Sequence, residues 1–97
     1  MIQYTTPTFI LTLPETVDLS LADTIIFSLR QGCFAIDKTV TADGQDVSVF
    51  LSQEETARLK PGMCAIQLNW TYADGTRACS NIVNVRVGAN LLKEVIS

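Results

Sequence analysis

Alternation of apolar and polar residues is the feature of this sequence that most limits its fold. A half-buried β-strand points successive side chains to opposite faces, so a period of two is typical of a strand with one face in a core. Six such runs follow one another along the chain. Their apolar faces are Phe9, Leu11 and Leu13; Ile25, Phe27 and Leu29; Phe34, Ile36 and Val40; Val47, Val49 and Leu51; Cys64, Ile66, Leu68 and Trp70; and Val83, Val85 and Val87.

Turn residues separate several of these runs. Ala42-Asp43-Gly44 and Ala73-Asp74-Gly75 each place Asp-Gly between two alternating segments. Glycine accepts the positive φ that tight hairpin turns require. The sequence therefore predicts a hairpin at each position.

Two residues break the alternation. Lys38 interrupts the apolar face of residues 34–40, which favours an edge position for that strand. Ile82 is out of phase with Val83 but in phase with Ala78. The last strand is therefore expected to carry a bulge or to change sheets.

A short helix is expected near residues 52–60. Ser52-Gln53-Glu54-Glu55 is a capping box, in which the Ser hydroxyl and the Glu carboxylate satisfy reciprocal backbone donors. Pro61-Gly62 ends the helix after about two turns. We expect this helix to connect one sheet to the other.

The length and composition favour one ordered domain over residues 1–97. Ninety-seven residues fit the usual span of about 100 to 200 residues per domain. With 47% hydrophobic and 18% charged residues, the chain lies far from the composition of disordered proteins. The pattern predicts an all-β fold, an immunoglobulin-like antiparallel β-sandwich of six to seven strands with one crossover helix. A small barrel is the main alternative.

The charged residues argue against several classes of function. A net charge of −3 repels a phosphate backbone, so we expect no nucleic-acid partner. The chain has no histidine, the commonest general base and metal ligand. No Gly-x-Ser-x-Gly elbow or metal-ligand spacing is present either. We expect no enzyme, no catalytic residue, no cofactor, no metal and no small-molecule substrate.

The N-terminal residues do not have the pattern of a signal peptide. Residues 1–12 alternate polar with apolar side chains and lack a basic segment. The longest apolar runs are far shorter than the roughly 20 residues of a membrane span. We expect synthesis in the cytoplasm and no membrane partner.

Three cysteines, Cys33, Cys64 and Cys79, form an odd set without C-x-x-C spacing. We interpret them as reduced thiols in the core. A pair bridging the two sheets is the alternative if the protein is exported.

Three further motifs each have a structural interpretation that we favour. Asp43-Gly44-Gln45-Asp46 is weakly similar to a calcium loop, but a hairpin explains it better. Asn69-Trp70-Thr71 matches an N-glycosylation sequon, which requires a secreted context. Trp70 and Tyr72, with Tyr4, would form a sugar-stacking platform if exposed. The phase of Trp70 instead places it in the core.

Apolar residues on faces expected to be polar are the candidate interface. Ile10, Ile26 and Ala35 are off-phase in otherwise well-patterned strands. Residues 89–97 form an apolar C-terminal tail that either docks back or reaches another chain. The candidate interface residues are Ile10, Ile26, Leu91, Leu92, Val95 and Ile96.

Most of the chain resembles small phage and prophage structural proteins of Gram-positive bacteria. It is also similar to the N-terminal domain of siphophage upper baseplate proteins. In that group a strand ending in Leu-Pro leads into an Asp-Leu-Ser turn, and a Leu-Thr/Ser-Gln-Glu-Glu-Thr helix precedes a strand ending near Trp. The segments that carry the resemblance are Pro7 to Pro14, Asp18 to Asp23, Leu51 to Thr56, Ile66 to Trp70 and Val85 to Gly88.

The resemblance implies a noncatalytic, virion-associated structural or assembly protein. Its partners would be other virion proteins or further copies of itself, in a homo-oligomer. We expect no separate distal domain like that of the larger baseplate proteins, so the resemblance implies a tail or baseplate adaptor. The alternative is a carbohydrate-binding or cell-surface-binding β-sandwich module.

Overall fold

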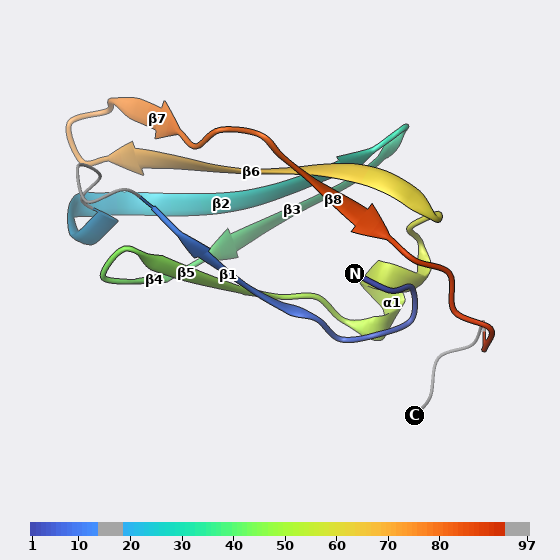
Figure 1. Ribbon diagram of the computed structural model, residues 1–97. Coiled ribbons are helices and arrows are strands. Elements are labelled where there is room, and N and C mark those ends of the chain that lie inside the picture. Colours follow the sequence, from blue (N-terminus) through green and yellow to red (C-terminus); the bar gives the residue numbers. More distant parts are fainter. Residues whose placement is uncertain (14–18, 93–97) are drawn as a thin grey trace.

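The computed structural model describes residues 1–13 and 19–92, which form two antiparallel sheets packed face to face (Figure 1). The prediction of an all-β sandwich with one short helix is confirmed. The three-stranded sheet has the order β1 (Thr8–Thr12), β5 (Asp46–Phe50), β4 (Ala42–Asp43). The larger sheet has the order β3 (Phe34–Val40), β2 (Ala22–Gln31), β6 (Gly62–Tyr72), with β7 (Arg77–Cys79) and β8 (Val83–Val87) both along the outer edge of β6.

The described residues contain more strands than the six or seven expected. One addition is β4, whose two residues are too few to show an alternating pattern. The other arises because the last predicted strand is divided into β7 and β8. Both segments pair with β6, so the chain does not change sheets there.

A bulge separates β7 from β8. Asn69 pairs with Cys79 and Ile66 pairs with Val83, so two residues of β6 lie opposite the three residues 80–82. The extra residue shifts the alternation by one position, so that inward residues have even numbers in β7 and odd numbers in β8. Ala78 faces the core beside Trp70, and Val85 faces it beside Cys64. The bulge expected from Ile82 is confirmed.

Both predicted hairpins are present. Asp43 pairs with Asp46 around Gly44, which has φ 64°. The β6–β7 hairpin closes where the Tyr72 N–H donates to the Thr76 carbonyl at 2.9 Å. A third hairpin, which was not predicted, joins β2 to β3 through Gly32 (φ 57°) and Cys33.

The helix α1 (Gln53–Ala57) connects β5 to β6, from one sheet to the other, as predicted. It is shorter than the two turns predicted, because it ends at Ala57 with Arg58 as its C-cap, before Pro61 is reached. Ser52 is its N-cap, and the complete capping box is formed with Glu55. A single 3-10 turn, η1 (Leu19–Leu21), precedes β2 and buries Leu19.

The core lies between the sheets and contains most of the apolar faces predicted from the alternation; Val83, predicted on the buried face of the last strand, is instead 49% exposed. Phe27 of β2 and Val47 of β5 are fully buried. Phe9 of β1 stacks on Phe27 across the two sheets, with ring centroids 6.5 Å apart. The other buried hydrophobic residues are Leu13, Leu19, Ile25, Leu29, Ile36, Val49, Leu51, Leu59, Cys64, Ile66, Leu68, Trp70 and Val87.

Candidate functional site

The two long sides of the sandwich differ. On one side the chain passes from β3 through Thr41 directly into β4, which joins the sheets covalently. On the other side β1 faces β7 and β8, and these segments belong to different sheets. In Figure 1, β1 (blue) and β8 (red) run along the near side, and the fainter β3 lies behind them.

Lys38 closes the β3 side. Its Nζ atom donates to the Phe50 carbonyl at 2.7 Å and to Glu55 Oε1 at 2.8 Å. Phe50 belongs to the part of β5 that extends beyond the two-residue β4. The side chain therefore links the two sheets and satisfies an edge carbonyl, which agrees with the predicted edge position of its strand.

These contacts shift the pKa of the Glu55 carboxylate. Burial alone would raise its pKa, but the hydrogen bonds from Lys38 and from the Ser52 N–H outweigh burial and lower the pKa. Glu55 is therefore held as an anion that caps α1 and pairs with Lys38.

A groove of about 550 Å³ lies on the opposite, β1 side. Its walls are the C-terminal part of β1, the middle of β6 and the bulge between β7 and β8. Among the described residues that line it, none carries a charged side chain. The lining includes Leu11, Leu13, Leu68, Trp70, Ala78 and Val83.

The backbone of β1 presents unused groups beside this groove. The Pro7 carbonyl accepts from the Leu51 N–H at 3.1 Å, and the Leu13 N–H donates to the Gln45 carbonyl at 3.0 Å. Odd-numbered residues of this strand therefore point their N–H and C=O groups toward β5. The alternation of an antiparallel ladder directs the same groups of Thr8, Ile10 and Thr12 toward the open edge.

The predicted interface residues do not form one patch. Ile10 is 65% exposed on the outer face of the three-stranded sheet. Ile26 is 37% exposed on the outer face of the other sheet. Ala35 is exposed on the same face. Leu91 and Leu92 are exposed beyond β8. Val95 and Ile96, and with them most of the predicted tail, lie outside the described residues.

The surroundings of Ile10 and Ile26 are different. Polar and charged side chains flank Ile26, including the Arg30–Asp37 ion pair at 3.0 Å. Hydrogen bonds from Ser28 and Arg30 lower the pKa of Asp37. Ile10 instead lies diagonal to Phe50, which is 55% exposed on the same face. Sequence reasoning missed Phe50, although it is out of phase with Val47 and Val49, which is the signal that singled out Ile10 and Ile26.

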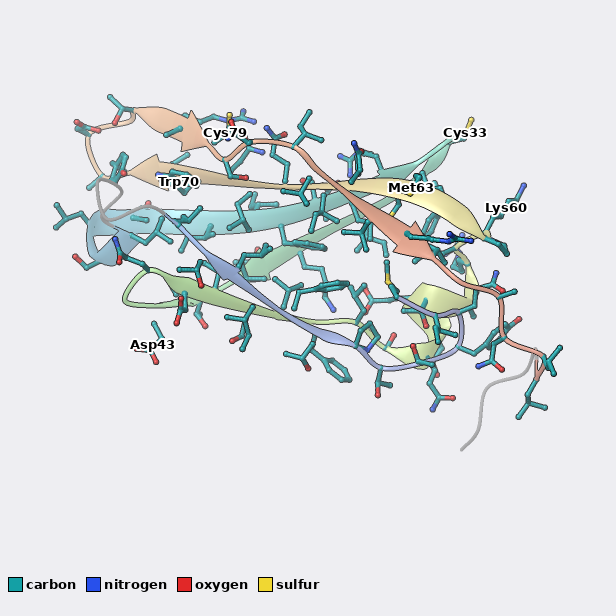
Figure 2. The ribbon with its side chains drawn as sticks, viewed as in Figure 1. Cys33, Asp43, Lys60, Met63, Trp70 and Cys79 are labelled. Atoms are coloured by element: carbon teal, nitrogen blue, oxygen red, sulfur yellow. The ribbon has the colours of Figure 1, made fainter. Side chains whose placement is uncertain are left out.

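Trp70 does not form an exposed platform. Its side chain is 3% exposed, and its indole N–H donates to the Tyr72 hydroxyl at 3.0 Å. The core position favoured for Trp70 is confirmed, and Figure 2 shows it at the β7 end of β6.

The cysteine prediction holds for one residue of three. Cys64 is buried, and burial raises the pKa of its thiol. Cys33 and Cys79 are exposed, so their assignment to the core is wrong. Cys33 is at the tip of the β2–β3 turn and Cys79 is on the outward face of β7 (Figure 2). All three are free thiols.

The described residues contain neither a candidate metal cluster nor a helix suited to span a membrane. No group of three or more His, Cys, Asp or Glu side chains lies close enough to hold a metal ion there. Within the same residues, no helix has the length and hydropathy needed to span a membrane.

The chain matches none of the known protein families in a family scan, and a search of curated proteins also finds no match.

Proposed function

We propose that this protein is a noncatalytic structural or assembly protein that acts through protein–protein interfaces. The observation that carries the proposal is the uncharged groove beside the open edge of β1. An uncharged groove next to free strand N–H and C=O groups suits an added strand of protein, because backbone hydrogen bonds supply affinity and the groove accepts side chains.

The setting we propose is a phage or prophage tail or baseplate. It rests on the sequence resemblance given above. In this setting the chain is an adaptor that contacts other virion proteins, further copies of itself, or both.

Light scattering across a concentration series tests self-assembly. We expect the purified chain, kept in reductant, to form a defined oligomer. A chain carrying Leu91→Ser and Leu92→Ser tests the contribution of the tail, since both side chains are exposed. A monomer that binds a glycan array would instead support the carbohydrate-binding alternative.

Quantitative mass spectrometry of purified phage particles, from a strain that carries the gene, tests the setting. We expect the chain at a fixed copy number relative to the tail proteins. Absence from the particles would contradict the virion assignment, whatever the chain does in solution.

A further inference from the structure

We infer that β1 pairs antiparallel with β1 of a second copy, centred on Ile10, so that the two three-stranded sheets become one. This inference rests on the proposed function, because it names the surface and the partner through which the chain assembles. Three observations carry it: the unprotected edge, the self-complementary sequence of the strand, and the groove beneath it.

The edge of β1 lacks the devices that protect the other edges. Natural sheets block edge pairing with charges, prolines, bulges or very short strands. β3 carries Asp37 and Lys38, and β4 has only two residues. β7 and β8 carry Arg77 and Arg86 and are separated by the bulge. In contrast, Thr8–Thr12 has the sequence TFILT, without a charge or a proline.

The N-terminal residues cover part of the β8 edge as well. The Gln3 N–H donates to the Gly88 carbonyl at 3.0 Å, and the Gly88 N–H donates to the Met1 carbonyl at 2.7 Å. These bonds pair the backbone N–H and C=O groups of Gly88, the residue just beyond β8. Among the described edge strands, β1 is therefore the one that presents free groups and an uncharged sequence together.

The sequence of β1 is complementary to itself. In an antiparallel pair centred on Ile10, Thr8 lies opposite Thr12 of the second copy and Ile10 lies opposite Ile10. These are the residues whose N–H and C=O groups face the open edge, so this register places every free donor opposite a free acceptor. Paired threonines and paired β-branched residues also suit neighbouring strands.

The groove lies on the same side of β1 as its inward side chains. With Thr8, Ile10 and Thr12 facing outward, Phe9 and Leu11 of the second copy point to the core side of the joined sheet. The groove on that side is uncharged, and Val83 in its wall is 49% exposed. Phe9 of each copy stays stacked on its own Phe27, and the groove leaves the core side of the joined edge free of charged side chains.

A charge-pair experiment tests the pairing. A five-residue strand pair makes an interface below the usual size of about 1,200 Å², so we expect micromolar association and measure sedimentation up to several hundred micromolar. Ile10→Lys places two lysines directly opposite each other, with Cα atoms about 5.5 Å apart, and the like charges should raise the dimer Kd at least about tenfold. Mixing the Ile10→Lys chain with an Ile10→Glu chain should restore dimers, as heterodimers.

The matched control uses the other exposed isoleucine. Ile26→Lys and Ile26→Glu alter the outer face of β2, whose two edges are already paired with β3 and β6. Neither change should affect association. Thermal melts verify that the chains fold, which we expect because Ile10 is 65% exposed. Dissociation by Ile26→Lys, or failure of the Ile10 mixture to associate, would overturn the inference.

Cross-linking tests the register. In a chain with Cys33→Ser and Cys79→Ser, Ile10→Cys should form a disulfide-linked dimer under mild oxidation, because paired Cα atoms about 5.5 Å apart suit a disulfide. Thr8→Cys should not, because the two copies of residue 8 would be about 14 Å apart. The opposite result would rule out pairing about Ile10.

The outcomes separate this inference from the proposed function. If Ile10→Lys leaves an oligomer intact, the β1 pairing is overturned, but the proposed role in assembly stands. A chain that stays monomeric at every concentration overturns the pairing too. The particle measurement above then decides whether the chain assembles with other proteins.

Discussion

Glu55 uses one carboxylate oxygen for two contacts, with the Ser52 N–H at 2.9 Å and with Lys38 Nζ at 2.8 Å. We expect Glu55→Ala to lower the free energy of unfolding by about 1–2 kcal/mol, because a cap and an ion pair are both lost. Glu55→Gln can keep the capping box, so it should cost less. Urea denaturation of both variants at pH 7 measures the difference; equal costs would mean that the capping bond from Glu55 contributes nothing beyond the ion pair.

The same carboxylate predicts a pH dependence. Its pKa in the folded chain lies below the ordinary value of 4.5, so the unfolded chain binds the proton more readily. The stabilisation is therefore complete above about pH 4.5 and is lost as the pH falls through the lowered pKa. Asp37 and Asp74, whose pKa values are also lowered, act in the same direction in every variant. The gap in stability between wild type and Glu55→Gln should narrow in acid.

The three thiols should differ in reactivity. Cys33 and Cys79 are exposed, and Cys64 is 3% exposed with a raised pKa. Because the thiolate is the reactive form, a thiol reagent such as Ellman's should react promptly with two groups in the native chain. The third should react after denaturation. Prompt reaction of all three would place Cys64 at the surface; Cys64→Ser is the control that removes the slow phase.

Among the elements, the break between β7 and β8 depends on Ser80. The Leu68 N–H donates to Ser80 Oγ at 2.9 Å, and the Ser80 N–H donates to the Leu68 carbonyl at 2.9 Å. Ser80→Ala should cost about 1–2 kcal/mol, since it leaves the Leu68 N–H without this acceptor. Hydrogen exchange at Leu68 should accelerate. Ser48→Ala, on the exposed outer face of β5, should change stability by less than about 0.5 kcal/mol.

The sequence predicts which face of a strand is buried better than it predicts which strands lie side by side. Alternation identifies the buried side of β6 because each inward residue loses contact with water, whatever strand lies beside it. Lys38 also identifies an edge, since a charged group on an inward face must reach solvent or a polar partner at the edge of the sheet. Neither signal says that β1 has a free edge, because that depends on pairing with the distant β5. The groove was missed for the same reason, although the lack of charge in TFILT was visible.

At the scale of the whole molecule, the sandwich depends on contacts between its two layers. Phe27 has no exposed surface and stacks on Phe9 of the opposite sheet. We expect Phe27→Ala to cost about 3–5 kcal/mol, a large part of the total of about 5–15 kcal/mol available to a chain of this size. Leu21→Ala is the control, since Leu21 is 69% exposed and its loss should cost less than about 0.5 kcal/mol.

Trp70 is the single tryptophan and is buried between the layers, so its fluorescence reports on the same packing. In urea, fluorescence and circular dichroism should change together if the two sheets unfold as one unit. The Phe27→Ala midpoint should fall at an unchanged slope. If fluorescence changes at lower urea than circular dichroism, the two layers separate while the strands persist. Each sheet would then be stable without the other. Coincident transitions mean that neither sheet survives alone, because each has one face that must be covered by the other.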